Sequence, residues 1–165
     1  MSERKLELRD IAGYMPYGLK YFAKHTGKIM KWERFNSIPL FDDSLKPILR
    51  PLSDLYATVT HGGKKVMPIV ECARAGTGFN NGWVAYSSCA TNKCKTHGTD
   101  YSFYWSKVSR CFMFSSCGTS GVDLKQASNT VRIFDTLNEL KIDYRGLIGA
   151  GLAVSVHDMK TEVYK

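Results

Sequence analysis

The sequence predicts an α+β fold, in which a twisted antiparallel sheet of hairpins is packed by one main helix. Two aromatic-rich runs flank a glycine-containing turn within residues 19–35, which is typical of a β-hairpin. Aromatics and cysteines crowd into a strand-like stretch at 89–117, and an amphipathic pattern over 123–141 predicts the helix. A chain of 165 residues fits a single domain, 1–165, that buries its own core.

The first half of the chain alternates short elements with turns. Apolar spacing near the amino terminus suits a short helix, which Pro16 and Gly18 end. After the hairpin, LKPILRPL (45–52) is predicted to be extended and to lie at a sheet edge, because its two prolines lack an amide donor. YATVTHGGKKVMPIV (56–70) has strand-like runs on both sides of a Gly-Gly turn, and a helical turn at 53–55 is possible before them.

The second half is predicted to hold the main helix. ARAGTGFNNG (73–82) is expected to be a loop, because its glycines and asparagines show no packing period. Asp123 can cap the helix, with Gln126 three residues further on as in a capping box. A glycine-punctuated turn and a short strand, LAVSV, then end the fold. The apolar residues that recur at helical spacing, and should form its packing face, are Leu124, Ala127, Val131, Phe134, Leu137 and Leu140.

Charge and composition bound the class of protein. No run approaches the roughly 20 apolar residues of a membrane span, and the charged start MSERKLELRD lacks the apolar core of a signal peptide. We therefore expect a reducing cytoplasm, in which the five cysteines are free thiols. The net charge is +8, and seven basic against two acidic residues from Val59 to Val122 place +5 of it in the middle. A basic middle favours an anionic partner, although net charge also serves solubility.

The cysteines and one histidine of the middle leave a zinc site open as an alternative. Cys89, Cys94 and His97 have a spacing that zinc accepts. Cys111 and Cys117 would lie about 20 Å apart on one strand, at roughly 3.3 Å per residue, so only one of them could join the others. Paired C-x2-C knuckles are missing, and free cysteines are usually small buried apolar groups. We therefore expect no metal and no cofactor.

An enzyme is a further alternative without a signature to support it. GTSG (118–121) is not a nucleophile elbow, GTGFNNG has the wrong glycine spacing for a dinucleotide loop, and HGGKK lacks the P-loop spacing. The four histidines, at positions 25, 61, 97 and 157, lie in no recognisable catalytic motif. A cysteine- or zinc-dependent enzyme thus remains a second alternative.

The predicted binding site lies on the central strands. In YSFYW, Tyr101, Phe103 and Trp105 alternate with Ser102 and Tyr104, so one face can be core while the other offers a ring. Exposed rings can stack on bases while neighbouring cations meet phosphates, and the alternative is that every ring is core. The predicted ligand-binding residues are Lys93, Lys95, Tyr104, Trp105, Lys107 and Arg110. A second basic and aromatic patch comprises Lys20, Lys24, Lys28, Lys31, Trp32 and Arg34.

Three segments of the chain together carry a resemblance. They are YMPYGLK (14–20), LKPILRPLSDL (45–55) and LNELKIDYRGLIGAGLAVSVHD (137–158). The chain resembles small uncharacterised proteins encoded by phages and other mobile elements of Bacteroidetes. This resemblance implies a phage or mobile-element origin in a bacterial host and carries no activity. Residues 76–121 lie outside it and form a basic, aromatic and cysteine-rich central insert, where we expect a function of its own.

The sequence thus predicts a non-enzymatic accessory protein whose basic aromatic surface binds an anionic partner, either nucleic acid or a nucleotide signal. The resemblance adds the expectation that it counters a host defence. The first alternative is an inhibitor that docks on a host protein, such as a nucleic-acid-binding defence effector. No membrane partner is expected.

Overall fold

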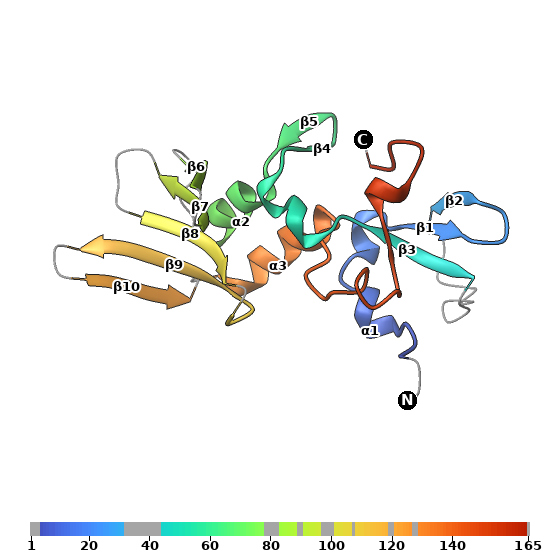
Figure 1. The fold of residues 1–165 in the computed structure, drawn as a ribbon, viewed down its shortest axis with the longest axis horizontal. Coiled ribbons are helices and arrows are strands. Elements are labelled where there is room, and N and C mark those ends of the chain that lie inside the picture. Colours follow the sequence, from blue (N-terminus) through green and yellow to red (C-terminus); the bar gives the residue numbers. More distant parts are fainter. Residues whose placement is uncertain are drawn as a thin grey trace. The chain divides into compact units, whose positions relative to one another are not determined.

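The chain has the predicted α+β class, with sheets of mostly antiparallel strands and few helices (Figure 1). Its elements form two compact units, of which unit 1 is Met1–Asp54, Thr60–Gly63 and Leu137–Lys165, and unit 2 is Leu55–Val59 and Lys64–Thr136. Within the part of the chain described, no helix is long and apolar enough to cross a membrane. The computed structural model describes residues 4–31, 44–77, 83–88, 91–96, 101–106, 108–118, 121–126 and 129–164.

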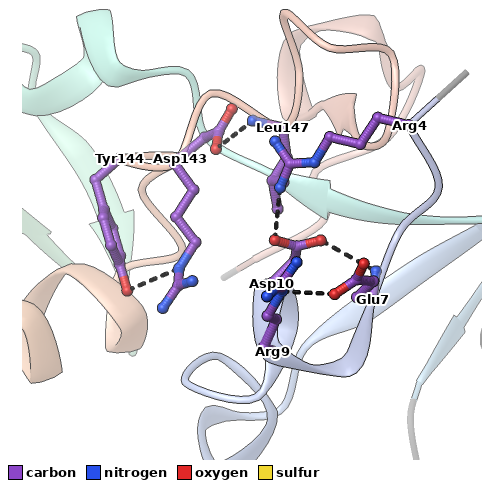
Figure 2. A network of polar contacts seen from close by, with 8 residues as sticks. Arg4, Glu7, Arg9, Asp10, Asp143, Tyr144 and Leu147 are labelled. Atoms are coloured by element: carbon purple, nitrogen blue, oxygen red, sulfur yellow. Dashed lines mark hydrogen bonds and ion pairs between the residues drawn. The ribbon is translucent and has the colours of Figure 1, made fainter. Parts of the chain in front are cut away.

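Unit 1 begins with the predicted short helix, α1 (Leu8–Ile11), followed by the 3-10 turn η1 (Met15–Tyr17). The carboxylate of Asp10 accepts a hydrogen bond of 3.0 Å from the amide of Glu7 and pairs with Arg4 at 2.7 Å (Figure 2). Asp10 thereby satisfies an amide at the helix start that would otherwise lack a partner. Gly18 ends η1 with φ 71°, a left-handed conformation that glycine adopts without strain.

The sheet of unit 1 has the strand order β11-β3-β1-β2. The predicted hairpin is confirmed as β1 (Lys20–Ala23) and β2 (Lys28–Lys31), which pair antiparallel. The extended segment is β3 (Leu45–Leu49), but its predicted place at the sheet edge is wrong, because β11 (Val154–Ser155) pairs with it in parallel. Since β11 reaches only the two positions after Pro47, the proline needs no amide donor on that side.

The core of unit 1 contains apolar residues from the amino-terminal turns, from the sheet and from the turn DYRGLI (143–148). Buried Asp143 fixes that turn, since its carboxylate accepts a hydrogen bond of 2.9 Å from the amide of Leu147 (Figure 2). It also accepts a hydrogen bond of 2.8 Å from the amide of Ile148. Tyr14 is fully buried and donates its hydroxyl to the carbonyl of Ile142 at 2.9 Å. The buried cluster is Leu6, Ile11, Tyr14, Leu19, Tyr21, Leu49, Leu147, Leu152 and Ala153.

The 3-10 turn η2 (Leu52–Tyr56) and a small hairpin lead along the chain to the first long helix. The predicted hairpin around Gly62 and Gly63 is confirmed as β4 (Val59–His61) and β5 (Lys64–Val66). The predicted loop is wrong over residues 73–77, which belong to helix α2 (Pro68–Thr77), while 78–82 lie outside the described residues. Helical spacing was present in the sequence, because the buried residues of α2 include Ile69, Cys72, Ala73 and Gly76.

Unit 2 is built on an antiparallel sheet with the strand order β10-β9-β8-β7-β6, each strand next to its neighbour along the chain (Figure 1). Helix α2 lies against β6, β7 and β8. The five strands are β6 (Trp83–Ser88), β7 (Thr91–Thr96), β8 (Tyr101–Ser106), β9 (Cys111–Gly118) and β10 (Gly121–Gln126).

The predicted helix over 123–141 is present as α3 (Thr130–Glu139), but it begins later. Asp123 lies in β10 opposite Ser116, so it does not cap a helix. The cap is Asn129, whose side-chain oxygen accepts a hydrogen bond of 3.1 Å from the amide of Arg132. Of the predicted apolar face, Leu137 and Leu140 are buried, together with Ile133, whereas Phe134 is half-buried and Val131 is 72% exposed.

Candidate functional site

Unit 1 contains a pocket of about 190 Å³ with a cationic and aromatic lining. We call it the Tyr164 pocket, after the tyrosine on which its cations converge. It combines three cationic side chains with a single carboxylate, a histidine and two tyrosines, a composition that attracts anions. The lining residues are Tyr17, Lys20, Arg50, His61, Glu139, Leu140, Lys141 and Tyr164.

The ring of Tyr164 is the meeting point of three cations. Lys20 Nζ lies 5.6 Å, Arg50 Cζ 6.0 Å and Lys141 Nζ 5.4 Å from the ring centroid, within the range of cation–π attraction. The ring is held by its hydroxyl, which donates to the carbonyl of Ile48 at 2.8 Å and accepts from the amide of Lys20 at 3.1 Å. Burial raises the pKa of Tyr164 to about 12, so the hydroxyl keeps its proton and stays a donor.

Lys141 occupies a backbone position that normally suits glycine. It follows the end of α3 with φ 62°, in the left-handed region. The amide of Ile142 donates to the carbonyl of Leu137 at 2.9 Å, and the amide of Lys141 donates to the backbone carbonyl of Asn138 at 3.1 Å. These two bonds form a Schellman motif, whose left-handed residue is usually glycine because a Cβ costs roughly 1–2 kcal/mol there.

The side chain of Lys141 is buried as well, with only 3% of the residue exposed. Its Nζ donates to the carbonyl of Glu139 at 2.5 Å and lies 5.7 Å from the ring centroid of Tyr17. Burial lowers the pKa of Lys141 to about 8; Glu139 opposes this shift and Arg50 adds to it. Lys141 is therefore a buried ammonium that remains mostly protonated at neutral pH.

Lys20, in β1, and Arg50, which directly follows β3, complete the cationic lining. The guanidinium of Arg50 donates to the carbonyl of Thr60 at 2.9 Å, and burial lowers its pKa, with Asp54 foremost among the groups opposing this. Lys20 Nζ donates to the carbonyl of Val163 at 2.5 Å. Among the described residues, the hydrogen bonds from these side chains go to neutral carbonyls.

The acidic groups near the pocket have partners of their own. Glu139, which is half exposed, contacts His61 Nε2 at 3.1 Å. Asp54 is buried and contacts His157 Nε2 at 2.9 Å. Among the residues that the structure describes, no carboxylate forms an ion pair with Lys20, Arg50 or Lys141. The three cations therefore converge without a contacting counter-charge.

The residues predicted from the sequence lie in unit 2 and are divided between two faces of its sheet. Lys95 pairs with Ser102 across β7 and β8, so alternation puts positions 93, 95, 102 and 104 on one face. Position 105 falls on the opposite face, together with Phe103. Lys93 and Lys95 are thus on the face of Tyr104, and Trp105 is not. Arg110 lies exposed in the turn before β9, and Lys107 is outside the described residues.

The face that holds Trp105 is the packed one. Phe103 is fully buried, and Phe112 is 5% exposed and stacks on it with ring centroids 5.2 Å apart. The ring of Trp105 meets Phe112 edge-on at 4.8 Å. This supports the alternative that Phe103 and Phe112 are core. Trp105 is half-buried against them, and Tyr104 is half-buried on the other face.

The structure places the candidate zinc ligands only in part. Cys89 and His97 lie outside the described residues, and Cys94 lies in β7 at the register position of Phe103. Cys111 Sγ lies 3.5 Å from the sulfur of Met113. Within the described ranges there is no group of three or more His, Cys, Asp and Glu side chains that could hold a metal ion.

Sequence reasoning missed most of the Tyr164 pocket, although a signal existed. Of the three cations it named only Lys20 as a candidate binding residue, within the amino-terminal patch. Yet the three segments of the resemblance all contribute, since Lys20 belongs to YMPYGLK, Arg50 to LKPILRPLSDL and Lys141 to LNELKIDYRGLI. Comparison with protein families, curated proteins and solved structures finds no match to this chain. The chemistry of the pocket therefore carries the functional argument.

Proposed function

We propose that the protein is a non-enzymatic binding protein that holds an anionic ligand in the Tyr164 pocket. The observation that carries this proposal is the convergence of Lys20, Arg50 and Lys141 on one ring, with no carboxylate ion pair to them among the described residues. Besides burial, the charge of Arg50 lowers the pKa of Lys141, and an anion bound near both would relieve this repulsion. Burial strengthens the interaction, because the pocket excludes part of the screening solvent.

The competing explanation is structural: the cations would only cover Tyr164 and satisfy carbonyl groups. Lys141 argues against it. A glycine there would complete the Schellman motif without left-handed strain, and a neutral side chain would avoid the cost of a buried charge. Residues that keep such unfavourable conformations cluster at functional sites. This supports a role for the ammonium group itself.

The proposal includes the partners expected from the sequence. The anionic ligand is a nucleotide signal or nucleic acid, and the face of Lys93, Lys95 and Tyr104 is a further surface for the same partner. A phage or mobile-element origin, a bacterial cytoplasm and a role against host defence belong to the proposal on the basis of the resemblance alone.

The test measures the binding of three anionic probes by titration calorimetry at low and high salt. The probes are inorganic phosphate, sulfate and a short single-stranded oligonucleotide. Lys20→Met should lower affinity for the bound probe by about tenfold or more, since it removes a charge-assisted hydrogen bond. Lys160→Met is the matched control, because Lys160 is an exposed lysine of unit 1 outside the pocket.

Two results would contradict the proposal. If wild type binds no probe at low salt, docking on a host protein becomes the leading account. If Lys20→Met and Lys160→Met weaken binding equally, affinity follows net charge and not the pocket.

A further inference from the structure

We infer that the Tyr164 pocket recognises a terminal phosphate: a phosphomonoester dianion, free or at the end of a nucleotide or strand, in preference to an internal phosphodiester. The inference rests on the proposed function and names the ligand chemistry. It follows from the size of the pocket, the arrangement of its donors and its charge.

The pocket is too small to hold a strand. Its volume of about 190 Å³ is below the roughly 300–1,000 Å³ of sites that enclose drug-sized ligands. Proteins that bind along a strand use an open groove that follows several successive phosphates. A compact pocket instead admits one end group, with the rest of the ligand outside it.

The donors suit a group with three terminal oxygens. Lys20 lies in β1, Arg50 directly follows β3 and Lys141 is the second residue after α3, so the cations come from three separate segments of the chain. Each ammonium has three N–H donors and the guanidinium has five, and within the described part of the chain each of the three side chains gives one donor to a carbonyl. Donors remain for a ligand with three terminal oxygens, whereas a phosphodiester has two.

The charge of the lining matches a dianion. Among the described lining residues, the three cations and the carboxylate of Glu139 sum to +2, with His61 left out of the sum. A phosphomonoester carries about −1.5 to −2 at pH 7, whereas a phosphodiester carries a single negative charge. Beyond the lining, Asp54 and Glu162 also act on Arg50, and Asp54 is engaged by His157.

The first experiment compares small ligands on the full chain. Methyl phosphate should bind at least about tenfold more tightly than dimethyl phosphate, which lacks one charge and one terminal oxygen. The preference should disappear in Lys141→Met and persist in Lys160→Met. The sources of the phosphate are then separated by comparing inorganic phosphate, a mononucleotide and oligonucleotides with a 5′-phosphate or a 5′-hydroxyl.

A second experiment uses the ligand's own ionisation. From about pH 5 to about pH 7 a phosphomonoester loses its second proton, so its affinity should rise by several fold. Sulfate stays a dianion over this range and serves as the control. The charged and titratable groups that face the ligand are Lys20, Arg50, His61, Glu139, Lys141, Tyr17 and Tyr164, with Asp54 and Glu162 acting on Arg50. These groups face both anions, so the ratio of the affinity for the phosphomonoester to the affinity for sulfate reports the ionisation of the phosphomonoester itself.

The outcomes separate the two proposals. Equal, Lys141-dependent affinity for methyl and dimethyl phosphate would overturn the terminal-phosphate inference and leave anion binding in place. The inference would also be overturned if the affinity for the phosphomonoester, relative to the affinity for sulfate, stayed constant with pH. Failure of every anion to bind at low salt would overturn both.

Discussion

The amide of Arg50 donates a hydrogen bond of 2.8 Å to the carbonyl oxygen of Lys141, so two mutually repelling cations are joined through the main chain. The carbonyl of Arg50 in turn accepts from the amide of Asp143 at 2.8 Å, completing a parallel bridge. This bridge fixes the end of β3 beside the end of α3 whether or not an anion is present. The pocket is therefore preorganised, which lowers the entropy cost of binding.

Replacement of Lys141 by glycine should separate stability from binding. Lys141→Gly removes the left-handed strain and the buried charge, so its free energy of unfolding should stay within about 1 kcal/mol of wild type. Lys141→Ala loses the same cation but keeps the strain, and should be about 1 kcal/mol less stable than Lys141→Gly. Both should lose affinity for phosphate, as urea unfolding and calorimetry can show. Phosphate binding at wild-type strength in either variant would remove Lys141 from the site.

The lowered pKa of Lys141 predicts opposite trends of stability and binding with pH. Between about 8 and 10.5 the unfolded chain holds a proton that the native Lys141 lacks, so the free energy of unfolding rises with pH. The slope is at most about 1.4 kcal/mol per pH unit. Anion affinity should fall over the same window, because neutral lysine contributes no charge. The free energy of unfolding of wild type and of Lys141→Met, measured at several pH values, isolates the effect of this lysine. A difference between the two proteins that stays constant with pH would contradict the lowered pKa of Lys141.

The sequence predicted best the elements that depend on local chemistry. The hairpin of β1 and β2 follows from turn residues that include Gly27, whose φ of 64° favours glycine. The start of α3 was misplaced because Leu124 fits both a helical face and the alternation of β10, and pairing with β9 decides between them. The edge placement of β3 failed for a similar reason, since β11 comes from the far end of the chain.

The pocket was beyond local reasoning. Lys20, Arg50 and Lys141 lie about 30 and 90 residues apart, and only the sheet and the bridge at Arg50 bring them together. No spacing rule connects such positions. The left-handed backbone of Lys141 also has no signature in sequence, because the usual indication of such a helix end is glycine or asparagine.

A methyl group at Gly13 should disturb the buried amide beside it. A Cβ on Gly13 would lie 2.7 Å from Nδ2 of Asn138. Asn138 is only 6% exposed, and its Oδ1 accepts a hydrogen bond from the hydroxyl of Tyr144. Gly13→Ala should therefore lower the free energy of unfolding by about 1–3 kcal/mol. Gly149→Ala is the control, because its nearest neighbour would lie at an ordinary 3.7 Å. Equal stability of the two variants in urea unfolding would mean that Asn138 moves aside freely.

The exposure of α3 predicts a marked contrast between neighbouring apolar residues. Leu137 is fully buried, so Leu137→Ala should cost about 2–5 kcal/mol, whereas Val131→Ala should change stability by less than about 0.5 kcal/mol. Phe134 is half-buried, so Phe134→Ala should fall below the 3–5 kcal/mol typical of a fully buried ring. Thermal and urea unfolding of the three variants test the ranking. A large loss in Val131→Ala would show that the helix face is assigned wrongly.

The two aromatic residues predicted to bind a ligand should behave differently. The ring of Trp105 packs edge-on against Phe112, and alanine would remove that contact, so Trp105→Ala should cost about 2–3 kcal/mol of stability. Tyr104 lies on the opposite face, and Tyr104→Ala should cost about 1–3 kcal/mol of oligonucleotide binding if a base stacks there. Melting curves and titrations of both variants separate these effects. Equal losses of stability would place both rings in the core.

Neutralising the basic residues of the middle segment tests whether the strands of unit 2 take part in nucleic-acid binding. The variant replaces Lys93, Lys95, Lys107 and Arg110 together by glutamine. Each lost phosphate contact should reduce the slope of log affinity against log salt by about 0.7 for a single strand. Titration with a short single-stranded oligonucleotide at two salt concentrations measures the slope. Lys20→Met, measured separately, reports on the end-group contact in unit 1. An unchanged slope in the quadruple variant, beside a loss in Lys20→Met, would assign the anion to the Tyr164 pocket and exclude these four residues from the interface.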